Sequence, residues 1–219
     1  MPTKAGGYFT EGGIRVPSVT TILSRFKESG ALMYWAWDQG RKGLDFRETK
    51  QAAADAGSAA HAMVEAHING WDFDPKPYDE LALSRATGAF SAFKEWAGQT
   101  GLKPVSTETP LVSEKYKYGG TLDAMLISGK LALGDWKTSN GVYGDYCCQL
   151  AAYGQLWNEH NPDNPVTGGY HLLRFSKQEE PDDPISFTHH YWSDLDIALK
   201  MFLLLRDAYE LDKRVKKLV

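Results

Sequence analysis

The residues best suited to chemistry are two aspartates and a lysine in the segment GGTLDAMLISGKLALGDWKTS, residues 119–139. Its alternating pattern predicts two strands joined by a short turn over 128–130. With a three-residue turn, Asp123 lies directly opposite Asp135, with Cβ atoms about 4.5–5.5 Å apart. Lys137 then shares their face, because side chains alternate with a period of two. A two-residue turn would instead place Asp123 on the other face.

Two opposed carboxylates repel each other unless a cation lies between them. A divalent ion with hard oxygen ligands, Mg²⁺ or Mn²⁺, would remove the repulsion. A lysine beside a metal-bound water can orient it or neutralise charge on an attacked phosphate. The three side chains therefore predict phosphodiester hydrolysis. The alternative is that Asp123 and Asp135 are solvent-facing strand residues, but Asp135 follows an apolar run and precedes Trp136, which favours the metal site.

Further polar residues on the flanking elements are candidates for the same site. His61 and Glu65 are four apart on one face of an Ala-rich helix, where Glu65 could hold a second metal or orient His61. Glu108 lies on the strand before the hairpin and could join the metal cluster or face solvent. Gln149 and Tyr153 form another i, i+4 pair, which is a functional pair or only a polar helix stripe.

The elements that must position these residues follow from capping and periodicity. Ser18 and Ser193 are suitable N-caps, Gly57 interrupts an Ala-rich helix and could separate two helices, and the last helix ends in a basic turn. Helices are expected over 18–26, 29–39, 48–69, 79–98, 145–160 and from 193 onward, and strands over 105–112, 115–127, 131–138, 166–175 and 186–192. This order predicts an α/β fold with a central mixed β-sheet flanked by helices, behind a helical N-terminal region.

Four short motifs in this order resemble those of the PD-(D/E)xK nuclease superfamily. G-x-x-D at 120–123 and D-x-K at 135–137 match its hairpin. Gln149 and Tyr153 match the Q-x-x-x-Y motif of the RecB-like exonuclease branch, which also occurs in CRISPR-adaptation and phage recombination exonucleases. His61, in GSAAHAMVE, stands where that branch carries a helical histidine.

The resemblance implies a restriction-endonuclease-like core and a role for each motif residue. The residues implied to hold the metal are His61, Asp123, Asp135 and the backbone carbonyl of Trp136, with Glu65 and Glu108 as additional candidates. Lys137 would act on the attacking water. Gln149 and Tyr153 would line the site, contacting the DNA strand or supporting the lysine.

Composition sets the broad class of the chain. Its 219 residues include 28 acidic and 24 basic side chains, for a formal net charge of −4. The length predicts a single domain over 1–219, with 1–100 mainly helical and carrying His61, and 101–219 forming the sheet core with the C-terminal helix. The acidity argues against a protein that simply coats nucleic acid, and is compatible with a local basic patch.

Cysteine content and hydropathy narrow the class further. The two adjacent cysteines, Cys147 and Cys148, are fewer than the four that an iron–sulfur cluster needs, so no cluster is expected. They fit a reducing cytoplasm, that of a bacterium or a phage-infected host cell. No stretch approaches the ~20 apolar residues of a membrane span. Without a G-x-x-x-x-G-K-[ST] loop, a stand-alone phage or mobile-element nuclease is expected rather than one fused to a motor.

Basic residues beside aromatic ones are candidates for DNA contacts. Arg41 and Lys42 follow Trp37 in LMYWAWDQGRKG, a combination that can stack bases and hold phosphates of single-stranded DNA. Lys115 and Lys117 lie close to the hairpin in sequence and would form a basic rim around its acidic centre.

These observations predict a Mg²⁺- or Mn²⁺-dependent DNA exonuclease acting on linear ends or single strands in recombination, repair or end processing. An oligomer, and a single-strand annealing or recombination partner, would be compatible with this role. The alternatives are an endonuclease with the same site, a DNA-binding protein with a decayed nuclease core, and, more weakly, a metallohydrolase of small phosphates. Nicking of closed circular DNA would favour the endonuclease, and metal-independent binding without hydrolysis would favour the decayed core.

Overall fold

A five-stranded mixed sheet forms the centre of the protein. The computed structural model describes residues 7–27, 30–139, 141–175 and 187–218, without the side chains of Ala31, Asp123 and Ala124. The strands lie in the order β3 (Lys103–Ser113), β4 (Tyr118–Ile127), β5 (Lys130–Thr138), β6 (Tyr170–Phe175) and β7 (Phe187–Trp192). Only β5 and β6 pair in parallel, and the other neighbours are antiparallel. The predicted α/β fold with a mixed sheet is confirmed.

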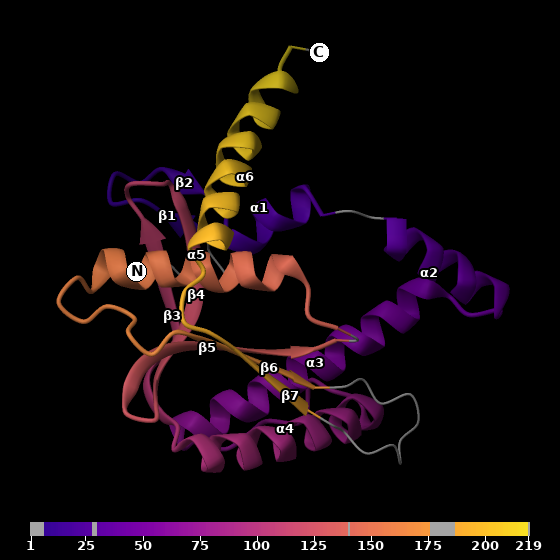
Figure 1. Ribbon diagram of the computed structural model, residues 1–219. Coiled ribbons are helices and arrows are strands. Elements are labelled where there is room, and N and C mark those ends of the chain that lie inside the picture. The colour runs from indigo at the N-terminus through magenta and orange to yellow at the C-terminus, as the bar shows by residue number, and fades with distance from the viewer. Residues whose placement is uncertain (1–6, 28–29, 140, 176–186, 219) are drawn as a thin grey trace.

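Helices cover both faces of this sheet (Figure 1). The helices are α1 (Val19–Arg25), α2 (Gly30–Arg41), α3 (Phe46–Asn69), α4 (Glu80–Thr100), α5 (Gly144–His160) and α6 (Asp196–Val215). Helices α3 and α4 pack on one face around Phe93 and Trp136, and α1, α5 and α6 pack on the other around Leu150 and Phe202. The expected order of elements is confirmed, although Ser29 and Ser186, where a helix and a strand were expected to begin, lie outside the described residues.

Helix α3 corrects the expectation that Gly57 divides two helices. It runs unbroken for 24 residues, from an N-cap at Asp45, whose carboxylate accepts from the backbone N–H of Arg47, to Gly70 in the left-handed conformation. A Cβ on residue 57 would lie 3.1 Å from the hydroxyl of Thr138. The glycine therefore lets α3 approach the end of β5 closely rather than ending the helix.

Two expectations at the ends of the chain also differ. The last helix begins at Asp196 rather than after a Ser193 cap, and its N-cap residue Leu195 makes no side-chain capping bond. Leu195 is buried in the core, so packing sets the start of α6 where a polar cap was expected. The N-terminal region also contains a short hairpin, β1 (Tyr8–Phe9) with β2 (Arg15–Val16), which the helical interpretation had missed.

The hairpin register differs by one residue from the three-residue turn. Ile127 pairs with Lys130 and Asp123 with Gly134, so the turn consists of Ser128 and Gly129 alone. Both turn residues have positive φ, 51° and 78°, as in the type I′ turns that match the right-handed twist of two-residue hairpins. Asp123 is therefore not directly opposite Asp135, and the argument from two opposed carboxylates is wrong as stated.

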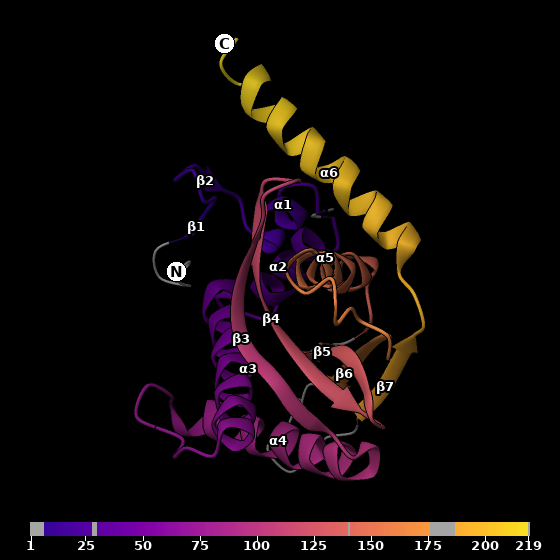
Figure 2. The same cartoon turned by 90° about the vertical axis from the view of Figure 1, so that its left-hand side faces the viewer.

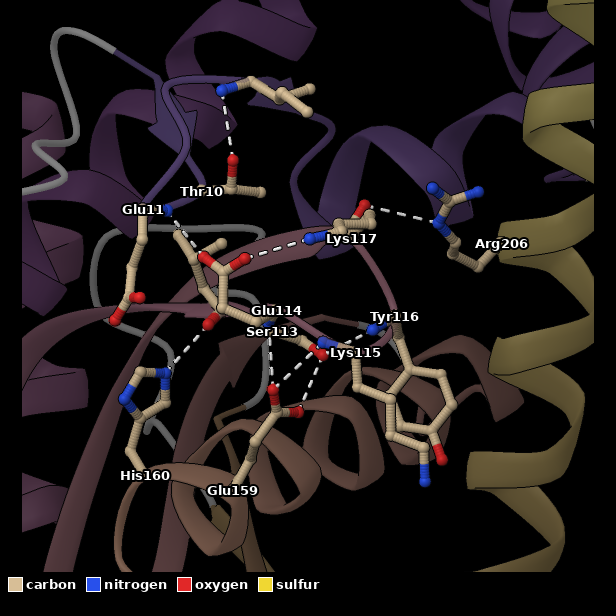
Figure 3. A network of polar contacts seen from close by, with 12 residues as sticks. Thr10, Glu11, Ser113, Glu114, Lys115, Tyr116, Lys117, Glu159, His160 and Arg206 are labelled. Atoms are coloured by element: carbon tan, nitrogen blue, oxygen red, sulfur yellow. Dashed lines mark hydrogen bonds and ion pairs between the residues drawn. The ribbon is translucent and has the colours of Figure 1, made fainter.

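The end of α5 holds the turn between β3 and β4 in place (Figure 3). The Glu159 carboxylate accepts from the Ser113 hydroxyl at 2.7 Å and from the backbone N–H groups of Glu114 and Lys115 at 2.9 and 3.2 Å. The Arg206 guanidinium of α6 donates to a backbone carbonyl of the same turn. These bonds fix β4 relative to α5, the two elements that carry the G-x-x-D and Q-x-x-x-Y motifs.

Candidate active site

The D-x-K segment of β5 forms the charged centre of a cleft between the sheet and its helices. Asp135 is 9% exposed, and its Oδ2 atom lies 2.7 Å from Nζ of Lys137. Among the described residues, Oδ2 makes no hydrogen bond, although it is buried. The Lys137 ammonium also lies 5.5 Å from the ring centroid of Tyr146 on α5. A buried carboxylate oxygen held only by an ion pair has lone pairs left for a further cation.

His61 reaches the same strand from α3. Its Nε2 lies 2.9 Å from the backbone carbonyl oxygen of Trp136, the residue that stands between Asp135 and Lys137 in the sequence. Burial lowers the pKa of His61, and the Lys137 charge acts in the same direction, against the opposite effects of Asp135, the Trp136 carbonyl and Glu108. Burial thus favours the neutral imidazole, the form that can bind a metal ion. Two residues predicted as ligands therefore lie in direct contact.

A bulge in β3 brings Glu108 to the cleft. The pairing with β4 shifts between Ser106 and Thr109, and Glu108 has a φ of 46°. A bulge of this kind redirects a side chain and is common next to active sites. Glu108 lines the cleft together with His61, Asp135 and Lys137. Of the two orientations considered for Glu108, the structure has the one that faces the site.

The Q-x-x-x-Y pair lies on the side of α5 that faces β4. Gln149 donates from Nε2 to the Tyr153 hydroxyl at 2.9 Å, and both line the cleft. A Cβ on Gly120 would lie only 2.6 Å from Cε1 of Tyr153. Gly120, the glycine of G-x-x-D, therefore makes room for the tyrosine of Q-x-x-x-Y, and the two motifs pack against each other.

The cleft, of about 350 Å³, also contains residues for which the sequence offered no signal. These are Tyr8, Ser18, Thr20 and Thr121, together with Leu122 and Gly134. The Tyr8 hydroxyl hydrogen-bonds to that of Thr121 at 2.8 Å, and a Cβ on Gly119 would meet the Tyr8 ring at 2.4 Å. The N-terminal hairpin reaches the site through this contact, which joins residues more than a hundred positions apart.

Two predicted ligands are less fully placed. Glu65 does not line the cleft but an adjoining hollow of about 520 Å³, which shares His61, Glu108 and Lys137 with it. For Asp123 only the backbone is described, opposite Gly134, so its predicted role as a ligand lies outside the described side chains. Within the described residues, no group of three His, Cys, Asp or Glu side chains is arranged to hold a metal ion.

The predicted DNA-contact residues fall into two separate regions. At the end of α2, the Arg41 guanidinium lies 4.9 Å from the ring centroid of Trp37, and Lys42 pairs with Asp38 at 2.8 Å. Trp37 is 54% exposed. In Figure 1, α2 extends from the body beside the start of α3.

Lys115 and Lys117 belong instead to the turn between β3 and β4 (Figure 3). Lys117 pairs with Glu114 at 2.9 Å, and the Lys115 ammonium lies 4.9 Å from the ring centroid of Tyr116. Neither lysine lines the cleft. A contact with DNA stays a prediction for both.

Comparisons with known proteins add little to this geometry. No family model and no curated protein matches the sequence. A crystal structure from Eubacterium rectale, named "Putative exonuclease", is similar at a TM-score of 0.48 and 12% identity, covering 70% of this chain and 68% of that one. A likeness this distant carries no argument about function.

Among the described residues, no helix has the length and apolar character to cross a bilayer.

Proposed function

We propose that this protein is a metal-dependent deoxyribonuclease, acting as an exonuclease on linear ends or single strands of DNA. One observation carries the proposal. The Asp135–Lys137 ion pair, His61, Glu108 and the Gln149–Tyr153 pair come from four separate elements and line one cleft. Converging charged residues around a concave site are typical of active sites. The motif order in the sequence supports the nuclease interpretation independently.

The proposed metal ion is Mg²⁺ or Mn²⁺, and two described side chains and one backbone carbonyl would contribute to its site. Asp135 offers a buried oxygen without a hydrogen bond, and His61 and the Trp136 carbonyl offer a neutral imidazole and a second hard donor. Glu108, which lines the cleft, is a further candidate ligand. Asp123 stays a candidate on the motif alone, because it pairs with Gly134 and not with Asp135. When bound, such an ion would polarise the phosphoryl oxygen and make the attacking water more acidic. No iron–sulfur cluster is proposed.

The protein groups have distinct roles in the proposed reaction. Lys137 orients the attacking water and offsets negative charge on the phosphate, with Asp135 and the Tyr146 ring holding its ammonium in place. The Gln149 amide, which donates to the Tyr153 hydroxyl, lines the wall where the scissile strand would lie. In the proposed reaction the water oxygen forms a new P–O bond while the P–O bond to the leaving sugar oxygen breaks, and that oxygen takes up a proton to leave as a hydroxyl.

Matched DNA substrates test this proposal directly. The purified protein should degrade linear DNA in Mg²⁺ or Mn²⁺, leave closed circular DNA intact and stop with a chelator. Nicked circles would show an endonuclease instead. Binding of DNA without hydrolysis in any divalent metal would refute the nuclease and favour a decayed core.

A paired substitution separates chemistry from folding. Asp135→Asn keeps the shape of the side chain but removes the charge that faces Lys137, so we expect loss of both turnover and Mn²⁺ binding by calorimetry. Asp163→Asn makes the same change on an exposed surface residue and should behave as wild type. Equal hydrolysis rates in the two variants would remove Asp135 from the mechanism.

The exposed face of α2 is the proposed contact for a single strand. Trp37 can stack on a base while Arg41 binds a phosphate, and stacking of one base contributes about 1–3 kcal/mol. In the inactive Asp135→Asn protein, Trp37→Ala should therefore weaken single-strand binding in fluorescence anisotropy by about fivefold or more. Trp71→Ala, at a similarly exposed tryptophan, is the control. Unchanged binding in Trp37→Ala would refute this contact.

A further inference from the structure

Helix α6 has a second apolar face that nothing in the described part of the chain covers. Its residues recur at alternating spacings of four and three, and the last lies just beyond the helix end: Ile197, Met201, Leu204, Ala208, Leu211, Val215 and Leu218. We call these seven residues the α6 seam. Five of its helical members are 50–87% exposed. Three heptads of this a/d pattern are typical of a helix that pairs with another helix.

The seam is distinct from the face by which α6 packs on the body. Leu199, Phe202 and Tyr209 pack into the core formed with α1 and α5. At 100° per residue these positions lie on the opposite side of the helix from the seam. The packed face already accounts for the attachment of α6, so the seam needs a separate explanation. In both views α6 runs outward to the C-terminal end (Figures 1 and 2).

The charges beside the seam indicate what could cover it. Asp212 bonds to Arg25 and Lys216, and Glu210 contacts Lys213 and Arg206. Asp207 and Arg214, seven residues apart on one flank of the seam, are exposed, and no ion pair joins either to another described residue. This flank thus carries an acid and a base at heptad spacing that form no ion pair within the described part of the chain.

We propose that the α6 seam binds the seam of a second copy of this chain in an antiparallel helix pair. With Ala208 opposite the partner's Leu211, Leu204 lies opposite the partner's Val215. In an antiparallel pair, residues on one flank of the seam face residues on the same flank of the partner's seam. Asp207 then faces the partner's Arg214, and the twofold symmetry repeats this pair. The small Ala208 alternates with the larger Leu211 at the centre of the contact.

Charge also decides between this arrangement and the other candidates. In a parallel pair, Asp207 would face the partner's Asp212, which places like charges together. A membrane surface would favour lysine and arginine along the flanks, whereas here the flanks include Asp207 and Asp212. Because the seam lies opposite the packed face, the two bodies lie on opposite sides of the helix pair.

Removal of the apolar contact is the first test. By light scattering with gel filtration at about 1–100 µM, the wild-type chain should have twice its monomer mass of 24.4 kDa. Leu204→Glu combined with Leu211→Glu should give a monomer with an unchanged circular dichroism spectrum. Ile14→Glu, at an exposed apolar residue outside α6, should remain a dimer. A wild-type monomer at the highest concentration, or a dimer that survives the double substitution, would overturn the proposal.

Charge reversal tests the orientation. Asp207→Arg or Arg214→Asp alone places like charges across both symmetric pairs and should weaken dimerisation about tenfold. The double variant Asp207→Arg/Arg214→Asp restores opposite charges and should return to near wild-type affinity. Both residues are exposed, so folding should not change. Failure of the double variant to recover, or a stoichiometry above two through the same seam, would refute the antiparallel pair.

Discussion

The contact between Gly120 and Tyr153 links two motifs and can be tested by one added methyl group. Gly120 lies in β4 with no positive φ, so an alanine there meets no backbone strain. Its Cβ would instead lie 2.6 Å from Cε1 and 3.0 Å from Cδ1 of Tyr153, and 3.2 Å from a methyl of Leu156. We expect Gly120→Ala to destabilise the fold by displacing the Tyr153 ring.

The size of the effect follows from these distances. Carbon atoms pack at about 3.5–4.0 Å, so the ring must retreat by roughly 1 Å. Overpacking of a filled core costs about 1–3 kcal/mol. The displaced ring also strains the bond from Gln149, which is worth about 0.5–1.5 kcal/mol. A loss of about 2 kcal/mol lowers the Tm of a chain of this length by about 4–8 °C.

A double-mutant cycle measured by urea unfolding assigns the loss to this contact. Gly120→Ala should be costly in the wild type and close to neutral in Tyr153→Ala, where the methyl has space. The coupling free energy should be about 1.5–3 kcal/mol. Proposed DNA hydrolysis should also fall in Gly120→Ala, because the Gln149–Tyr153 pair moves.

Substitution of a second glycine, Gly98, is a control in which the free energy of unfolding should rise rather than fall. No other atom lies within 4 Å of a Cβ placed on Gly98, which is exposed on helix α4. Gly98→Ala should stabilise the protein by about 0.5–1 kcal/mol through the lower entropy of the unfolded chain. If Gly120→Ala were as stable as the wild type, or equally costly with and without Tyr153, the packing argument would be wrong.

Three further predictions concern polar groups. Glu159→Ala should lose about 2 kcal/mol in urea unfolding, because its carboxylate accepts three hydrogen bonds from one turn; a change near zero would contradict this. Burial lowers the pKa of His171 to about 4. The unfolded chain therefore takes up the proton first, so the stability present above pH 6.5 should fall as the pH drops from 6.5 towards 4, and His171→Gln should show a smaller fall. Lys137→Met should lower DNA hydrolysis by about 10²-fold or more while Mn²⁺ binding persists; near-normal turnover would exclude Lys137 from the proposed reaction.

The sequence by itself determined most of the architecture. Periodicity and capping predicted the six described helices and the five strands of the main sheet in the right order and missed only β1 and β2 among the described elements, because amphipathic patterns reflect which face each element must bury. Ser128 and Gly129 also contained the signal for a two-residue turn, since both can adopt positive φ in a type I′ hairpin. The structure has this two-residue turn, so its register differs by one residue from the one that a three-residue turn predicts.

Only the tertiary structure decided which polar residues share the cleft. The bulge that turns Glu108 inward depends on pairing with β4, and Tyr8 reaches the site through contacts made across the whole chain. The roles of Gly119 and Gly120 are likewise invisible in the sequence, because they consist of space left for two distant tyrosines. The heptads of α6 can be read from the sequence, but only packing shows which of its two apolar faces the body leaves uncovered. Such features depend on contacts between distant residues, which local patterns do not encode.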